Sequence, residues 1–211
     1  MRWTFGVEPL PQSLTIASLV RTVTGLVLSL EAPHAAVERL IDALRSAEAE
    51  LGRLVSRDPT PRIGRAAASD GRIYLDHSRD IGSFNPCFPT YQIRVDGDRA
   101  VGTVRFPIVY EGPPGVVHGG FLALFFDSIV QHHNCDLGLA GKTTSLGVTY
   151  RRPTPMLAEL QFEVERSVEE RKITSVARLL ADGVVLCDAL VSAVAGNRDQ
   201  LPEVSPRRAE A

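Results

Sequence analysis

Apolar residues in the first third of the chain recur at the three- and four-residue spacing of amphipathic helices. The segment from Ser13 to Leu30 repeats them along one face, and Ser13 can cap its start. After Pro33, which suits the first turn of a helix, the same spacing returns up to Leu54. The sequence therefore predicts two helices joined by a short turn, a helical hairpin that needs something to pack against.

From Tyr91 onward the apolar residues mostly alternate with polar ones, which is the period of β-strands. Two such runs flank an Asp-Gly turn, a sequence that favours a hairpin. Four more follow a long apolar segment, and short turns with Pro, Gly or charges separate them. Because strands with such short connections pair antiparallel, these runs predict an antiparallel sheet built from residues 91–95, 100–106, 143–152, 157–167, 172–180 and 184–194.

The most apolar run in the chain, Phe121–Val130, lies between the second and third of these strands. It contains no Gly or Pro, and none follows before Gly138, so it predicts a helix. Because the run is apolar nearly all round, we expect the helix to be buried. One buried helix with an antiparallel sheet to wrap it is an α+β layout, in which the sheet curls round the helix.

These patterns divide the chain into three parts. Residues 1–70 form an N-terminal helical extension and linker, and residues 71–196 carry the sheet and the buried helix. Residues 197–211 form a polar, proline-bearing tail that we expect to be flexible. We expect the helical hairpin to pack across the sheet or at a subunit interface.

Composition and charge exclude several classes of partner. The 23 Lys and Arg residues against 25 Asp and Glu give a net charge of −2, with no basic excess for binding nucleic acid. No apolar run is long and uncharged enough to span a membrane, and the N-terminus lacks the pattern of a signal peptide. The odd count of three cysteines favours a reducing compartment. We therefore expect a cytoplasmic protein without nucleic-acid or membrane partners.

Candidate chemistry gathers in Glu111-Gly-Pro-Pro-Gly-Val-Val-His-Gly-Gly120, the segment that leads into the buried helix. Gly119 and Gly120 stand where the helix begins, so their N–H groups are among the donors that no helical carbonyl satisfies. Glycine lets a ligand approach this backbone, and the helix dipole favours negative charge there. The arrangement suits an oxyanion hole for a carbonyl compound, although a simple tight turn would have the same sequence.

Asp127 is a carboxylate in the middle of this apolar helix, where a charge is costly unless it has partners. A nearby hydroxyl such as that of Ser145 could satisfy it for purely structural reasons. An apolar residue would nevertheless serve stability better at this position, so the carboxylate favours a functional role.

The spacing of Gly119 and Asp127 bears on assembly. Eight residues separate them, which corresponds to about 12 Å along a helix axis. A carboxylate that activates an attack on a bound carbonyl must act within about 3 Å of the reacting atoms. One helix cannot supply both groups to one site, whereas two antiparallel copies related by a two-fold axis can. The spacing therefore predicts a homodimer, which could pair further into a dimer of dimers.

The His-Gly-Gly segment, the buried helix with an Asp nine residues after the His, and the four strands that follow resemble the hotdog-fold thioesterases. Within that superfamily the segment from Glu111 to Gly120 is similar to the PaaI-like acyl-CoA thioesterases. The resemblance covers residues 73–195 and implies a hotdog fold, with an antiparallel sheet wrapped around one long hydrophobic helix. It also implies hydrolysis of an acyl-CoA thioester to free acid and coenzyme A without a cofactor or metal ion.

The resemblance assigns roles to individual residues. It implies that Gly119 donates the oxyanion N–H and that Asp127 of the other subunit activates water or attacks the thioester directly; the sequence leaves both routes open. It implies that a hydroxyl on the strand after the helix, Ser145 with Thr144 beside it, helps to hold the water. His118 is expected to orient the oxyanion loop rather than to act as the base.

Other residues are candidates for contact with the substrate. Val117, Gly120 and Phe121 adjoin the oxyanion segment. Arg151 and Arg152, on the strand that includes Ser145, could reach the phosphates of coenzyme A, because arginine suits bidentate phosphate contacts. Strand alternation sends these two side chains to opposite faces, so we expect at most one of them to do so.

The sequence departs from the family pattern at two places. Some relatives carry Asn six residues before the His, and this chain has Gly112 there. The buried helix continues as Gln131-His-His-Asn-Cys135, which is more polar than the small apolar residues expected. Adjacent histidines on a helix point about 100° apart, so this run does not suit a single metal ion.

Two alternative functions remain open at this stage. One is a non-catalytic hotdog domain that binds acyl-CoA, for which the extra helical hairpin is the attraction. The other is an acyl-CoA hydratase. The segment Gly82-Ser-Phe-Asn-Pro-Cys-Phe88 keeps the Asn-Pro of the hydratase motif, but it lacks the acid and the base of that motif.

Overall fold

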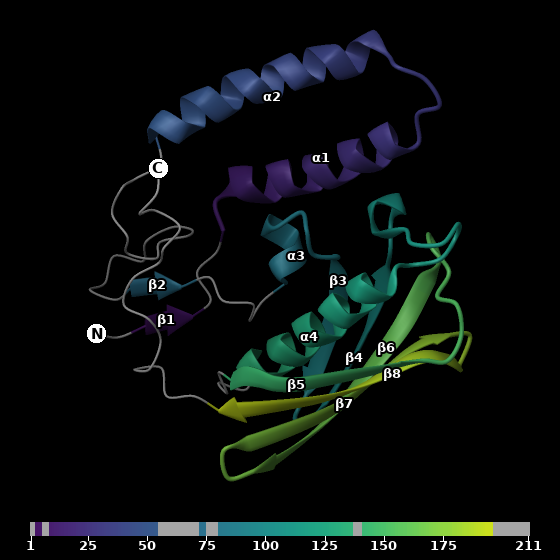
Figure 1. Cartoon of the computed structure of the whole chain (residues 1–211). Helices are drawn as coiled ribbons and strands as arrows, with labels where there is room; N and C mark the ends of the chain where they lie inside the picture. Colours follow the sequence, from purple (N-terminus) through teal and green to yellow (C-terminus); the bar gives the residue numbers. More distant parts are fainter. Residues whose placement is uncertain (1–2, 6–8, 55–71, 75–79, 137–140, 196–211) are drawn as a thin grey trace.

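A computed structural model describes residues 3–5, 9–54, 72–74, 80–136 and 141–195 of the chain (Figure 1). The predicted linker after residue 54 and the predicted tail from residue 197 lie outside these residues. The described elements, in chain order, are β1 (Trp3–Phe5), α1 (Pro11–Leu28), α2 (Ala35–Leu54), β2 (Arg72–Tyr74), α3 (Ile81–Phe84), β3 (Tyr91–Asp96), β4 (Arg99–Arg105), the 3₁₀ helix η1 (Ile108–Tyr110), α4 (Gly119–Asp136), β5 (Gly141–Tyr150), β6 (Glu159–Glu169), β7 (Lys172–Ala181) and β8 (Val184–Ala195).

The predicted antiparallel sheet and its long helix are confirmed. Six strands form one sheet in the order β3-β4-β6-β7-β8-β5, and every neighbouring pair is antiparallel. Helix α4 lies against one face of this sheet (Figure 1). It begins at the glycine pair, as the sequence predicts, and continues to Asp136. The short strands β1 and β2 form a separate parallel pair.

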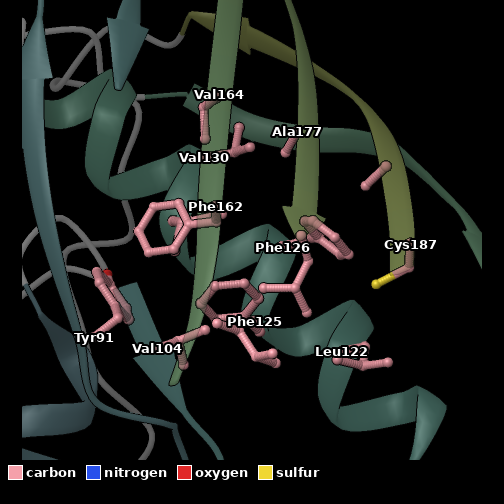
Figure 2. Packing of buried hydrophobic residues seen from close by; sticks show 14 of the residues in the cluster. Tyr91, Val104, Leu122, Phe125, Phe126, Val130, Phe162, Val164, Ala177 and Cys187 are labelled. Carbon is pink, nitrogen blue, oxygen red and sulfur yellow. The ribbon is translucent and has the colours of Figure 1, made fainter. Parts of the chain in front are cut away.

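The core lies between α4 and the sheet (Figure 2). Phe125 of α4 meets Phe162 of β6 edge to face, with ring centroids 5.4 Å apart, and meets Phe106 in the same way at 5.5 Å. All three rings are 0–1% exposed, and burying each side chain contributes about 1.5–3 kcal/mol to folding. The opposite stripe of α4, which carries Leu124 and Asp127, is only partly buried. Within a single chain, burial of the helix on all sides is therefore incomplete along this stripe.

The two N-terminal helices are also present, with boundaries that differ from the prediction. Helix α1 begins at Pro11, and Ser13 lies inside it, where its N–H donates to the Leu10 carbonyl, so Ser13 is not the cap. Pro33 precedes α2, whose start is capped by the His34 side chain, which accepts a hydrogen bond from the Ala36 N–H. None of the helices in the described part of the chain is long and apolar enough to cross a membrane.

Helix α1 lies against α3 and η1 rather than across the sheet, which corrects one of the two expected placements (Figure 1). Its anchor is Arg21, which is 9% exposed. The Arg21 guanidinium donates hydrogen bonds to the Tyr110 hydroxyl at 3.2 Å and to the carbonyls of Asn85 and Phe88 at 3.3 and 3.1 Å. A cation buried in this way links the N-terminal helix to the segment just before the predicted oxyanion loop. Helix α2 has no buried residues.

Replacing Arg21 by methionine is expected to lower the free energy of unfolding by about 2–3 kcal/mol, because several carbonyl groups lose a charged donor while the side-chain volume is kept. Urea denaturation followed by circular dichroism would measure the change. Arg45→Met is the matched control, since the Arg45 side chain on α2 is 74% exposed. Equal denaturation midpoints for the two variants would contradict an anchoring role for Arg21.

The thiols of Cys187 and Cys87 are expected to differ in reactivity. Burial raises the pKa of the Cys187 thiol to about 11, so at pH 8 only about one thousandth of it is the reactive thiolate. Cys87, by contrast, is exposed. Iodoacetamide at pH 8 should therefore alkylate Cys87 in the native protein and Cys187 only after unfolding, as peptide mass spectrometry would report. Equal labelling rates in the native protein would contradict this assignment.

Candidate active site

The loop between η1 and α4 is closed on itself, which fixes where α4 begins. The N–H of Gly112 donates to the Val116 carbonyl, and the N–H of His118 donates to the Tyr110 carbonyl, each at 2.9 Å. The Val117 N–H bonds to the Thr154 carbonyl at 2.9 Å and ties the loop to the segment after β5. The start of the helix is therefore held by backbone hydrogen bonds on both sides.

Gly112 has a structural reason to be glycine. A Cβ atom at this position would lie 2.8 Å from the Cα of His118, closer than real Cβ contacts come. The asparagine that some relatives carry cannot fit here without moving the backbone that leads into α4. The close approach of the two segments thus explains this departure from the family pattern.

The first turn of α4 leaves one backbone donor unused. The Phe121 and Leu122 N–H groups donate to the His118 carbonyl, and the Gly120 N–H donates to the Nδ1 atom of His118 at 3.0 Å. Within the residues that the structure describes, the Gly119 N–H donates to no acceptor. The glycine predicted to supply the oxyanion donor is therefore the one whose N–H is available.

The side chains of His118 and Tyr150 hold the peptide group between Gly119 and Gly120. His118 accepts a hydrogen bond at Nδ1, so that nitrogen is not available to take a proton from water. This geometry fits the orienting role expected for His118. Tyr150, at the end of β5, donates from its hydroxyl to the Gly119 carbonyl at 2.8 Å. Tyr150 could not be identified from the sequence, because nothing in a strand sequence marks which helix end a side chain reaches.

Asp127 receives a hydrogen bond from a residue other than those predicted. The Thr143 hydroxyl donates to Asp127 Oδ1 at 2.7 Å. The Thr144 hydroxyl instead donates to the Ser192 carbonyl at 3.1 Å, and Ser145 is exposed. Within the described chain, the hydroxyl that contacts Asp127 is therefore that of Thr143 rather than that of Ser145. The expectation that Ser145 and Thr144 help to hold the water stays a prediction.

A β-bulge explains the difference. Thr143 pairs with Ala193 of β8 and Ser145 pairs with Ser192, so Thr144 is an extra residue in β5. Leu146 packs toward the core, and simple alternation would therefore turn Thr143 away from α4. The inserted residue shifts this alternation and re-aims Thr143 at the helix.

Gln131 extends the contact by one more residue. It lies four residues after Asp127, on the same face of α4, and is 7% exposed. Its side-chain Nε2 donates to the Thr143 Oγ1 at 2.7 Å. Asp127, Thr143 and Gln131 thus form a hydrogen-bonded row between α4 and β5.

Asp127 and the Gly119 N–H belong to one continuous helix. Their separation along its axis is about 12 Å. Within one chain the carboxylate therefore cannot act on a carbonyl that is bound at Gly119.

The two histidines that follow Gln131 have structural partners. The Nδ1 atom of His132 lies 3.1 Å from the Tyr91 hydroxyl, and Nε2 of His133 lies 2.9 Å from the Gly97 carbonyl. The two rings thus point to opposite ends of β3, because Tyr91 begins that strand and Gly97 lies in the turn that follows it. The described part of the chain contains no cluster of His, Cys, Asp or Glu suited to a metal ion.

The predicted substrate contacts divide into exposed and buried residues. Gly120 is exposed and Phe121 is partly exposed, whereas Val117 is buried. Arg151 and Arg152 lie just beyond the end of β5, and both of their N–H groups donate to the Leu186 carbonyl. Regular alternation therefore does not apply to them, contrary to the prediction.

The two arginines also differ in their contacts. The Arg151 guanidinium forms an ion pair with Asp188, whereas no ion pair joins the exposed Arg152 to another described residue.

The Asn-Pro segment contains a local turn, in which the Asn85 side chain accepts a hydrogen bond from the Cys87 N–H. Its neighbouring carbonyls bind Arg21, so this segment supports the fold.

Comparison with solved structures places the fold among thioesterase superfamily proteins. A crystal structure of one such protein is 28% identical, with a TM-score of 0.70, and the match covers 90% of this chain and 98% of that one. A Streptococcus mutans protein bound to acetyl-CoA is 12% identical, with a TM-score of 0.50 over 52% of this chain and 91% of its own. A Streptococcus pneumoniae thioesterase solved with coenzyme A is 20% identical, with a TM-score of 0.47 over 50% and 87%. No family model matches the sequence, and neither does any curated protein.

These matches differ in what they include. A match over 90% of this chain must extend into the N-terminal helices, so the 28% identical protein shares part of that extension. The two streptococcal proteins match about half of the chain. The match to the 28% identical protein thus includes more of this chain than the two streptococcal matches do.

Proposed function

We propose that this chain, a hotdog-fold member of the thioesterase superfamily, hydrolyses acyl-CoA thioesters to a free acid and coenzyme A. One observation carries the proposal. The helix that begins with the unused Gly119 N–H also holds Asp127, whose carboxylate is oriented by the Thr143 hydroxyl. A donor for a developing oxyanion and a carboxylate able to accept a proton are the two groups that thioester hydrolysis needs.

In this proposal the thioester carbonyl oxygen accepts a hydrogen bond from the Gly119 N–H. Attack on the carbonyl carbon places negative charge on that oxygen, at the N-terminus of α4, where the helix dipole favours it. His118 and Tyr150 keep the donor in place through their bonds to Gly120 and Gly119. Gly120 and Phe121 would contact the substrate beside it.

Asp127 acts as the general base. It takes one proton from a water molecule while the water oxygen bonds to the carbonyl carbon, which gives a tetrahedral oxyanion. The oxyanion then collapses, the carbon–sulfur bond breaks, and the coenzyme A thiolate leaves with the bonding pair. Direct attack by the Asp127 oxygen, which would form a mixed anhydride that water then cleaves, uses the same two residues and remains the alternative route.

Two subunits would build each site. Because Gly119 and Asp127 of one chain are about 12 Å apart, the carboxylate that acts at one Gly119 would come from the other chain of a homodimer. An antiparallel arrangement of two α4 helices brings the start of each beside the middle of the other. Two sites per dimer follow from this symmetry, and two such dimers could associate further.

Two arginine residues are candidates for binding the coenzyme A moiety. Arg152 is exposed at the end of β5, near the Tyr150 that contacts Gly119, and could bind a phosphate group. Arg151 is already paired with Asp188 and is the weaker candidate. The acetyl-CoA in the Streptococcus mutans neighbour supports this class of ligand, and the sequence resemblance favours the PaaI-like subgroup.

Thiol release from a panel of short-chain, long-chain and aromatic acyl-CoAs tests the proposal. The purified full-length protein is expected to release free coenzyme A from at least one class, and the preferred member would identify the acyl group. Binding of panel members without any thiol release would favour the non-catalytic alternative. The colorimetric thiol assay needs a no-enzyme control for spontaneous hydrolysis.

A further inference from the structure

Gln131 is a polar residue in helix α4, and its burial needs a physical explanation. Its side chain is 7% exposed, and a buried amide is costly unless its hydrogen-bonding groups have partners. An apolar residue would satisfy the packing of α4 without that cost. His132 and His133 have partners elsewhere, whereas the Gln131 amide reaches Thr143, the residue that contacts Asp127.

The row of hydrogen bonds has a fixed direction. A threonine hydroxyl has one proton to donate, and an ionised carboxylate can only accept. Because Gln131 Nε2 donates to Thr143 Oγ1, the hydroxyl proton is free to point at Asp127 Oδ1. If the amide were turned over, its oxygen would compete with Asp127 for this single proton. The carboxylate and the amide therefore select one orientation of the hydroxyl between them.

We infer that Gln131 is a positioning residue for the proposed reaction. It holds the Thr143 hydroxyl as a donor to Oδ1 of Asp127 and so fixes the plane of that carboxylate. The other carboxylate oxygen, Oδ2, then faces the water with a defined orientation. This inference rests on the proposed hydrolytic function and adds to it a residue that acts through Thr143 without touching the substrate.

The β-bulge supports the same assignment. The extra residue in β5 is what turns Thr143 toward α4, and Gln131 contacts Thr143 at the hydroxyl that the bulge re-aims. A bulge on β5 and a buried amide on α4 thus serve the same hydroxyl. The bulge disrupts strand pairing, and burial of the amide removes it from water. Both unfavourable features occur at the hydroxyl that orients Asp127.

A double-mutant cycle with Gln131→Met and Thr143→Val tests the inference. Methionine keeps the length of the side chain and removes the donor, and valine keeps the shape of threonine and removes the hydroxyl. Each single variant is expected to lower kcat by about three- to tenfold with little change in KM, the effect of one lost positioning hydrogen bond. The double variant should fall no further than Thr143→Val alone, because Gln131 acts through Thr143.

The controls separate the inference from the function on which it rests. Cys135→Ala, one turn further along α4, should leave kcat unchanged, and thermal denaturation shows whether each variant is folded. Additive losses in the cycle, or an unchanged kcat for folded Gln131→Met, would overturn the inference while leaving the hydrolase intact. A wild-type protein without thiol release would overturn both. If Gln131→Met does not fold, Gln131→Asn, which draws the donor back by one methylene, takes its place in the cycle.

Discussion

The Asp127→Asn variant is expected to lower kcat for thioester hydrolysis by at least about a hundredfold while KM changes little, because a general base typically contributes 10²–10⁴-fold to the rate. Asparagine has the same shape, and its side-chain oxygen can still accept the Thr143 hydroxyl proton. Packing of α4 should therefore be retained. Steady-state thiol release on the preferred acyl-CoA would measure the loss.

The matched control for this variant is Asp96→Asn. Asp96 is an exposed carboxylate at the end of β3, where it adjoins the turn to β4. The same chemical change there should leave kcat within about twofold of the wild type, because a surface substitution away from the core and the proposed site usually has little effect. Equal activity of the Asp127→Asn protein and the wild type would remove Asp127 from the mechanism.

Mixing two inactive variants is expected to restore activity. Gly119→Pro removes the proposed oxyanion donor at the first position of α4, where helices tolerate proline. Asp127→Asn removes the proposed base. In a mixed dimer, one site combines the intact Gly119 of one chain with the intact Asp127 of the other, while the second site carries both defects. Random exchange makes half of the dimers mixed, so roughly a quarter of wild-type activity should return.

The exchange requires that subunits be mixed under mild denaturation and then returned to native buffer. Each variant taken through the same treatment alone provides the background rate. Size-exclusion chromatography would verify that both variants form dimers before and after mixing. No recovery in a verified mixed dimer would mean that both groups act within one chain, contrary to the 12 Å spacing along α4.

The sheet and the central helix could be predicted because the spacing of apolar residues along the chain differs between strands and helices. Alternation placed the six strands to within about two residues of their observed bounds, since each has one face on the core. The start of α4 at the glycine pair could be predicted because the long apolar run begins directly after it. These features depend on local sequence alone.

Features that depend on contacts across the fold could not be predicted. The bulge in β5 changed the hydroxyl partner of Asp127 from Ser145 to Thr143, and period-two alternation cannot reveal an inserted residue. The polar position of Gln131 was visible in the sequence, but its partner was not. The sequence likewise did not indicate the partners of Arg21, which is the buried anchor of α1.

The central claim is that this chain cleaves the acyl-CoA thioester bond with water. Incubating the purified protein with its preferred acyl-CoA in ¹⁸O-labelled water, and quantifying both products by mass spectrometry, tests that claim directly. Hydrolysis should give one free coenzyme A for each free acid, with one labelled oxygen in the acid after many turnovers. Acyl-CoA recovered unchanged, or a product that still carries coenzyme A, would contradict it.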